Sequence, residues 1–259
     1  MGEDKMFDFD RWAETGPKEE QYPTEFVPEN IFVISIGGSV IIKEKPSSAV
    51  IAKIANSINE LKKEGYKFAV TLGGGKIARD YTAIGRTLGA NNFLLDEIAI
   101  SLTRANAALF ASAIDDAFPI TQTKIHEAKK IIDSGKVPVY GGIFPGLTTD
   151  TIAALLAEFL NATFVNLSNQ KGIYTADPKE DEFARFIPKM DHERLLKIML
   201  RSDTRKPGQN TIIDLMACLI LRRSKIKTIV CSALDMEDFE NAIRGNEFEG
   251  TIIETREEE

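Results

Sequence analysis

Four short apolar runs in this sequence each end in a turn rich in glycine, serine or threonine. The runs cover residues 31–36, 67–72, 137–140 and 163–167, and the turns cover 37–39, 73–75, 141–149 and 168–172. Helix-like segments separate the runs, so predicted strands alternate with predicted helices. This alternation favours a parallel sheet covered by helices on both faces. Because ligands bind beyond the carboxyl ends of such strands, we expect the four turns to meet at one site.

The composition is that of an ordinary globular protein. With 259 residues and 43 % hydrophobic content, the chain can bury a full core as one large domain or two joined ones. No apolar run reaches the ~20 residues of a membrane helix, and the N-terminus lacks a signal-peptide pattern, so we expect a cytoplasmic protein without a membrane partner. Cys218 and Cys231 are expected to be buried free thiols. Neither of the two histidines lies near a cysteine pair, so no zinc site and no Ser-His-Asp triad is predicted.

Residues 1–30 form an acidic N-terminal extension outside the predicted core. They carry a net charge of −6 out of the −7 of the whole chain, contain three prolines and show no sustained periodicity. Four aromatic side chains, Phe7, Phe9, Trp12 and Tyr22, are expected to dock on the body or on a neighbouring subunit. The remainder is nearly neutral and has no basic stripe, so a nucleic-acid partner is not predicted.

The segment 141–150, Gly-Gly-Ile-Phe-Pro-Gly-Leu-Thr-Thr-Asp, is suited to bind phosphate. Its small residues leave backbone amides open to an anion, and the start of the following helix adds a positive end. Asp150 would repel a phosphate unless it holds a cation or orients a lysine, so its position suggests a catalytic role. The alternative is a plain strand-to-helix connection in which Asp150 is the helix N-cap.

The segment 73–78 also fits the Gly-x-Gly-x-x-Ala pattern of dinucleotide-binding turns. That reading requires an acid at the end of the next strand, whereas the candidate Asp96 lies in a helical stretch, so it is disfavoured. No P-loop string is present. Lys76 and Arg79, one turn apart at a helix start, are better suited to clamp phosphate oxygens, although a solvated helix face would also explain them.

Six segments follow one another in the order of a known family. They are Ile-Ser-Ile-Gly-Gly-Ser-Val (34–40), Gly-Gly-Gly-Lys-Ile-Ala-Arg (73–79), Leu-Thr-Arg-Ala-Asn-Ala (102–107), Gly-Gly-Ile-Phe-Pro-Gly-Leu-Thr-Thr-Asp (141–150), Ala-Ala-Leu-Leu-Ala-Glu-Phe (153–159) and Gly-Ile-Tyr-Thr-Ala-Asp-Pro (172–178). Together they resemble the amino acid kinase superfamily, and most closely its archaeal-type uridylate (UMP) kinases. The likeness runs in order from about residue 31 to 254 and leaves only the extension unmatched.

The resemblance implies a fold and an activity. The fold would be an α/β three-layer αβα sandwich on a central, mostly parallel eight-stranded sheet, with one kinase-like domain over 31–259 assembled as a homohexamer. Residues of about 31–160 would bind the acceptor and about 161–254 would bind ATP. The activity would be transfer of the γ-phosphoryl group of MgATP to UMP, giving UDP in pyrimidine nucleotide biosynthesis.

The resemblance also assigns site residues. Asp150 falls where the superfamily keeps an aspartate that organises active-site lysines, and Lys206 precedes the late substrate loop, so with Lys76 and Arg79 they form the predicted catalytic set. Mg²⁺ would accompany ATP, and no side chain is assigned as its ligand. The ATP contacts would be Gly38, Ser39, Gly75, Arg79, Ser168, Tyr174 and Asp177, and the UMP contacts would be Gly74, Asp96, Gly142, Ile143, Phe144, Pro145, Gly146, Leu147 and Thr148.

This chain departs from the family pattern at several positions. Ser35 stands where much of the superfamily has a lysine, Leu147 replaces a histidine, and Lys171 reverses a charge beside the nucleotide. These changes leave two alternatives to a UMP kinase open. One is a related kinase for another small phosphate or carboxylate, and the other is a noncatalytic oligomer that binds nucleotides or oxyanions.

Overall fold

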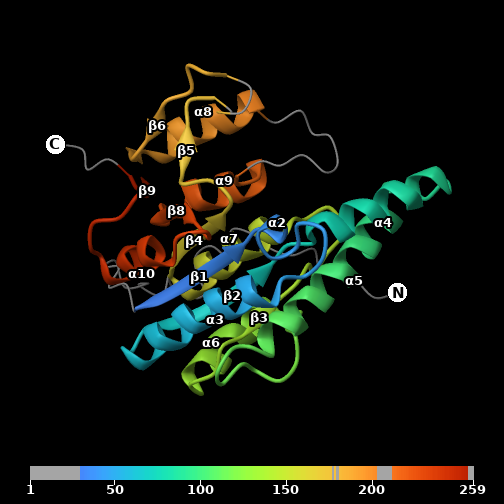
Figure 1. Cartoon of the computed structure of the whole chain (residues 1–259), viewed down its shortest axis with the longest axis horizontal. Coiled ribbons are helices and arrows are strands. Elements are labelled where there is room, and N and C mark those ends of the chain that lie inside the picture. The colour runs from blue at the N-terminus through green and yellow to red at the C-terminus, as the bar shows by residue number, and fades with distance from the viewer. Residues whose placement is uncertain (1–29, 177, 179–180, 203–211, 256–259) are drawn as a thin grey trace, which may run out of the picture.

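The computed structural model describes residues 30–176, 178, 181–202 and 212–255, and these form a three-layer αβα sandwich (Figure 1). The central sheet has seven strands in spatial order, β3 (Val139–Tyr140), β2 (Lys67–Leu72), β1 (Ile31–Ile36), β4 (Thr163–Ser168), β8 (Thr228–Ser232), β9 (Gly250–Ile253) and β7 (Lys189–Met190). Among the described strands of this sheet, β8 and β9 pair antiparallel and all other neighbours pair parallel. The expected parallel α/β fold is therefore confirmed. Most of the acidic extension lies outside the described residues.

Helices cover both faces of this sheet. One face packs against α6 (Ala128–Asp133), α7 (Thr149–Leu160), α8 (His192–Ser202) and α9 (Leu215–Arg223). The other packs against α2 (Gly38–Ile41), α3 (Ser48–Lys63), α5 (Asn92–Ala111) and α10 (Met236–Arg244). Helix α4 (Gly75–Thr87) lies beside α5, and the pair projects from the body (Figure 1). A 3₁₀ turn, η1 (Ile125–Glu127), precedes α6.

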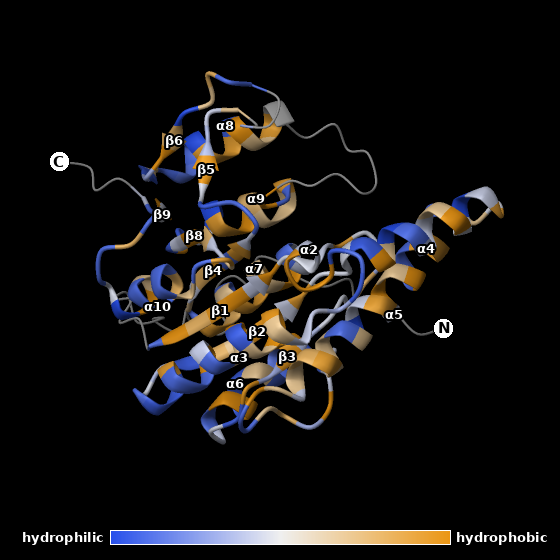
Figure 2. Ribbon diagram, in the orientation of Figure 1, coloured by the Kyte–Doolittle hydropathy of each residue, from blue (hydrophilic) through white to orange (hydrophobic). Residues whose placement is uncertain are grey.

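The strand sequences explain why both faces are covered. In β1, Ile31 and Val33 enter the core on the α7 side, while Ile34 and Ile36 enter the core on the α3 side. This is the period of two expected of a strand, and all four side chains are buried. The hydropathy colouring shows the same division, with apolar central strands and polar outer faces on α3 and α10 (Figure 2).

The expected count of eight strands in the sheet is not met by the described residues. The segment 117–122 lies beside β3 and pairs with the chain there through two isolated parallel bridges, Ala117 with Val137 and Gln122 with Tyr140. Pro119 lies between these bridges and has no N–H to donate, which prevents a continuous ladder. An antiparallel pair, β5 (Ile173–Tyr174) with β6 (Phe186–Ile187), forms a separate two-stranded sheet.

Two further expectations can be compared with the described part of the chain. Cys218 and Cys231 are both buried free thiols, as predicted. Among the described residues, no helix has the length and apolar character needed to cross a bilayer.

Candidate active site

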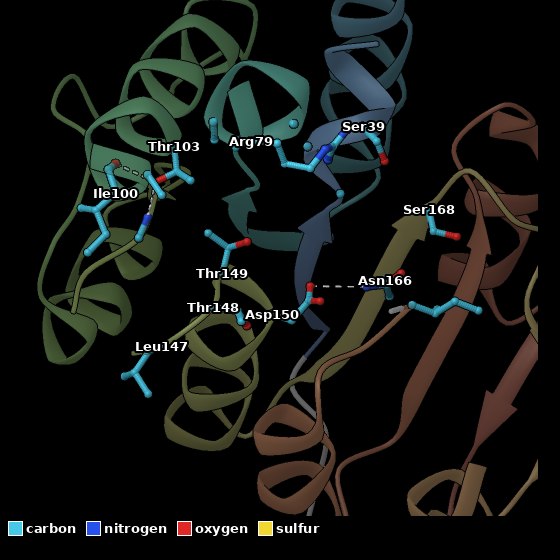
Figure 3. A pocket seen from close by; sticks show the side chains of 18 of the residues that line it. Ser39, Arg79, Ile100, Thr103, Leu147, Thr148, Thr149, Asp150, Asn166 and Ser168 are labelled. Carbon is cyan, nitrogen blue, oxygen red and sulfur yellow. Dashed lines mark hydrogen bonds between the residues drawn. The ribbon is translucent and has the colours of Figure 1, made fainter. Parts of the chain in front are cut away.

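The four turns meet around one pocket of about 420 Å³ at the carboxyl ends of β1, β2 and β4 (Figure 3). This confirms the expected convergence of segments that are far apart in the sequence. The lining residues from the turns are Gly37, Gly38, Ser39, Gly74, Gly75, Gly142, Leu147, Thr148, Thr149, Ser168, Asn169 and Gln170. Parallel strands bring their carboxyl ends to a single edge, so this clustering follows from the sheet topology.

The turns after β1 and β2 touch backbone to backbone. A Cβ atom added to Gly38 would lie only 2.0 Å from the amide nitrogen of Gly75, and one added to Gly73 would lie 2.5 Å from that of Gly38. Gly75 also has φ of +65°, in the left-handed region. Glycine is required here because any side chain would push the two turns apart.

Asp150 lies in the first turn of α7, at the centre of the pocket lining (Figure 3). The N-cap of this helix is Thr148, whose side chain accepts a hydrogen bond from the amide of Thr151 at 3.1 Å. The interpretation of Asp150 as a capping residue is therefore wrong. Its carboxylate accepts a 2.5 Å hydrogen bond from the hydroxyl of Ser35 and a 3.5 Å bond from the Nδ2 atom of Asn166. These contacts aim the carboxylate from α7 toward β1 and β4.

The environment of Asp150 disfavours its charge. Burial, followed by the nearby Asp214 carboxylate, raises the pKa of Asp150 to about 7, and the hydrogen bond from Ser35 offsets part of this rise. The Oδ1 atom of the buried Asn166 has no hydrogen-bond partner. The Asp150 carboxylate and the Asn166 side chain thus lie together without a positively charged partner among the described residues. A cation is the kind of ligand that would satisfy both oxygen acceptors.

The raised pKa of Asp150 predicts a pH-dependent stability. The folded state holds the Asp150 proton more tightly than the unfolded state, where the pKa of the carboxyl is about 3.9. The free energy of unfolding therefore falls as pH rises from about 4 to about 7 and is constant at higher pH. We expect the free energy of unfolding of the wild type, relative to Asp150→Asn, to drop by about 2 to 4 kcal/mol over this window. Chemical denaturation in magnesium-free, nucleotide-free buffer measures this difference. A constant difference from pH 4 to 8 would contradict it.

Sequence reasoning missed Asp214, which holds the start of α7 next to Asp150. Asp214 caps α9 by accepting from the amides of Met216 and Ala217, and it also accepts from the hydroxyls of Thr148 and Thr151. It thereby ties the start of α9 to the start of α7. The available signal was an aspartate directly before an apolar helical run, which predicts a cap but not its partners on another helix.

The two predicted phosphate clamps separate in the structure. Arg79 lines the pocket, whereas the ammonium group of Lys76 binds Asp80 at 2.6 Å and lies 3.8 Å from Glu44. Lys76 is not among the lining residues, so the structure does not bring it to the site in this state. Lys206 lies outside the described residues.

The structure brings some of the predicted UMP contacts to the pocket and leaves others outside it. Gly74, Asp96, Gly142, Leu147 and Thr148 line the pocket, and the Asp96 carboxylate accepts a hydrogen bond from the amide of Gly146 at 2.8 Å. The remaining members of the turn, Ile143, Phe144, Pro145 and Gly146, are not among the lining residues, and the Phe144 side chain is 65 % exposed.

On the predicted ATP side, Gly38, Ser39, Gly75, Arg79 and Ser168 line the pocket. Tyr174 instead packs edge-on against Phe186 within the β5–β6 pair, at a ring distance of 5.5 Å, and does not line it. Asp177 lies outside the described residues.

Lys171 does not present an unpaired charge to the nucleotide side. Its ammonium group binds the carboxylate of Glu249 at 2.7 Å and is not among the pocket-lining groups. The charge reversal noted in the sequence is therefore neutralised by a partner 78 positions away.

Comparison with known proteins places this geometry in a family. The model of the amino acid kinase family matches residues 30–232. The chain belongs to the amino acid kinase family. The uridylate kinase of Archaeoglobus fulgidus is 42 % identical over 222 residues, covering 85 % of this chain and 98 % of the relative. That of Methanocaldococcus jannaschii is 39 % identical over 225 residues, covering 86 % and 98 %.

Solved structures of this family have the same fold. The crystal structure of uridylate kinase from Archaeoglobus fulgidus superposes with a TM-score of 0.76 at 39 % identity and covers 86 % of this chain and 99 % of that one. The UMP kinase structure from Bacillus anthracis gives a TM-score of 0.75 at 19 % identity, covering 89 % and 98 %, which supports the fold alone.

Proposed function

We propose that this chain is a UMP kinase, which transfers the γ-phosphoryl group of ATP to UMP and so serves pyrimidine nucleotide biosynthesis. The observation that carries the proposal is the pocket in which four strand-end turns surround Asp150 and Arg79. The names of the two similar proteins support UMP as the acceptor. Such an enzyme would act in the cytoplasm on small molecules, without a nucleic-acid or membrane partner.

The pocket has an acceptor side and a donor side. We assign residues of about 31–160 to acceptor binding, with Asp96 and the turn at 142–148 as the principal contacts. We assign about 161–254 to ATP binding, together with the turn at 37–39. The glycines at 38 and 75 let phosphate groups approach the backbone amides closely.

This reaction needs charge neutralisation more than proton transfer. The phosphate of UMP has its second pKa near ~6, so its oxygen is already a nucleophile at neutral pH. Neither His126 nor His192 lines the pocket. The Arg79 guanidinium and the N-terminal amides of α4 and α7 can hold two polyanions in line and stabilise the charge that develops between them.

Mg²⁺ carried by ATP fits the oxygen atoms found here. Asp150 and the unpaired Oδ1 atom of Asn166 are ligands of the kind this ion prefers. Among the residues described, no group of three or more acidic, histidine or cysteine side chains forms a metal site alone, so phosphates and water would complete the ion's shell. Bound there, Mg²⁺ would supply positive charge between donor and acceptor.

A coupled assay with MgATP and a panel of acceptors tests the proposal. We expect turnover with UMP to exceed turnover with CMP, AMP, carbamate or isopentenyl phosphate. Turnover of another acceptor with UMP inert would instead favour the related kinase, which the replacement at Leu147 in the pocket lining allows. Nucleotide binding without any transfer would favour the noncatalytic oligomer, although the pairing of Lys171 with Glu249 removes one reason for it.

We also propose that the chain assembles through the projecting α4–α5 pair, consistent with a homohexamer. Five large apolar side chains along this pair and its connection are more than half exposed, namely Tyr81 (57 %), Ile84 (60 %), Leu88 (81 %), Phe93 (64 %) and Leu94 (51 %). Scattered exposed apolar residues are normal, but a cluster of this kind marks an interaction surface. A second copy of the same face can bury it.

Replacing both Ile84 and Leu88 with glutamate should break this assembly. The change places charges in an interface that excludes water, so we expect the hexamer to dissociate and the elution volume and sedimentation coefficient to shift to smaller species. Phe183→Glu, at a side chain that is 79 % exposed on the β5–β6 connection, is the matched control and should leave the size unchanged. An unaltered size for the double variant would exclude this face as the contact.

A further inference from the structure

One face of α5 contacts both the turn at 141–148, here called the acceptor turn, and the turn at 73–75, here called the phosphate turn. Asp96, Ile100, Thr103 and Asn106 are spaced by four, three and three residues, so they form a single stripe along the helix. The stripe runs from Asp96 to Asn106, a separation of ten positions that corresponds to about 15 Å of helix length. The stripe contacts the turn that follows β3 and, at Asn106, the turn that follows β2.

The acceptor turn lies along this stripe from Asp96 to Thr103. The Gly146 amide donates to Asp96 at 2.8 Å, and the Gly142 amide donates to the hydroxyl of Thr103 at 2.7 Å. Arg104 adds two bonds from its guanidinium, from Nε to the carbonyl of Gly142 at 2.9 Å and from Nη2 to the carbonyl of Ile143 at 3.4 Å. The turn is therefore attached to α5 through both amides and carbonyls.

The phosphate turn is attached to the other end. The buried Asn106 side chain donates from Nδ2 to the carbonyl of Gly73 at 2.9 Å and to that of Gly74 at 3.3 Å. Those carbonyls directly precede the start of α4, where Gly75 lines the pocket.

Close packing prevents the acceptor turn from shifting against the helix. A Cβ atom on Gly141 would lie 2.6 Å from the amide nitrogen of Arg104, and one on Gly142 would lie 2.9 Å from Cγ1 of Ile100. The glycines here serve the contact with α5 as well as the exposure of amides to a ligand. Hydrogen bonds and close packing thus both fix the distance between the acceptor turn and α5.

We propose that Arg104 and Asn106 are positioning residues that fix the separation between the acceptor turn and the phosphate turn. Neither side chain lines the pocket, so each acts through the backbone that it holds. The proposal rests on the proposed kinase function. In-line transfer requires the reacting atoms at near-contact distance, and an error of about 1 Å can cost about 10²-fold in rate.

The test uses Asn106→Leu and Arg104→Met, with Ser101→Ala as the control. Ser101 is exposed on the same helix, and within the described part of the chain its hydroxyl donates to the Glu97 carbonyl of α5 itself. We expect kcat to fall by about 10- to 100-fold in both variants, while the KM values for ATP and UMP change less than about 3-fold. Arg104→Lys, which keeps one donor, should recover part of the loss.

A bisubstrate analogue gives a readout that general damage would not mimic. Adenosine and uridine joined by five phosphates would span both turns, so its affinity depends on their separation. We expect its affinity to fall at least about 10-fold in the variants while the separate nucleotides bind as in the wild type. Equal losses for the analogue and the separate nucleotides, or no loss at all, would overturn the proposal.

Hydrogen exchange in the absence of nucleotide separates this proposal from the assignment of the acceptor. Exchange of the 141–148 backbone should rise in Arg104→Met and remain unchanged in Ser101→Ala. If UMP proves inert in the wild type but exchange still rises, the acceptor assignment fails and the positioning role stands. If Asn106→Leu does not fold, Arg104→Met decides the question, because the Arg104 bonds found among the described residues go to carbonyls of the acceptor turn. Unchanged exchange in Arg104→Met would overturn the proposal.

Discussion

Replacing Asp150 with asparagine is expected to lower kcat by about 10² to 10³-fold while the affinity for UMP persists. Asparagine keeps an oxygen that can accept from Ser35, so the local geometry survives. What is lost is the charge that would hold a cation or orient a lysine between the two nucleotides. Steady-state kinetics and calorimetric titration with UMP measure the two effects separately.

The same Asp150 variant should be more stable than the wild type at pH 7 to 8, because it removes a carboxyl whose pKa is raised to about 7. A site that is costly to fold and necessary for turnover is typical of catalytic residues. Ser35→Ala is the matched comparison, since it removes one hydrogen bond and leaves the charge. Unchanged turnover in Asp150→Asn would mean that another residue carries the chemistry.

Replacing Gly38 with alanine is expected to abolish ATP binding and to lower the free energy of unfolding by about 2 to 4 kcal/mol. The added Cβ would lie 2.0 Å from the Gly75 amide nitrogen and 2.7 Å from that of Gly74, so two backbone segments must separate. Backbone cannot move aside as a flexible side chain can, and the turns that line the pocket would shift with it. Thermal unfolding and nucleotide titration measure the outcome.

Gly37→Ala is the control for the stability part of this prediction. Its added Cβ would lie 3.6 Å from the Leu167 carbonyl oxygen, an ordinary contact, and its φ of −57° suits any residue. We expect its melting temperature to remain within a few degrees of the wild type, because a well-tolerated surface change alters stability by about 0.5 kcal/mol or less. Equal destabilisation by alanine at the two adjacent positions would contradict the close-approach explanation for Gly38.

The pattern of strands and turns predicted the site because the topology of a parallel sheet leaves few choices. Apolar runs such as 31–36 and 67–72 had to be buried strands, and right-handed helical connections bring their carboxyl ends to one edge. Convergence of the turns at 38, 75, 142 and 168 then followed without knowledge of any contact. The structure adds that the glycines at 38 and 75 lie where backbone approaches backbone.

The partners of long, exposed side chains were predicted less well. Lys76 and Arg79 have equivalent positions on the sequence pattern, yet only Arg79 lines the pocket. The difference is that Asp80 and Glu44 offer Lys76 a nearby charge, and a flexible ammonium group follows such partners. Lys171 behaves in the same way with Glu249.

By itself, the sequence determined the α/β class, the strand ends that carry the site and the central place of Asp150, because periodicity and glycine turns are local signals. Tertiary structure alone decided that Asp214 joins α9 to α7, that Asn166 leaves an acceptor unpaired, and that α5 holds two distant turns. Those contacts join residues 30 or more positions apart. No local pattern specifies such pairs, since they form only when packing of the whole sheet brings the elements together.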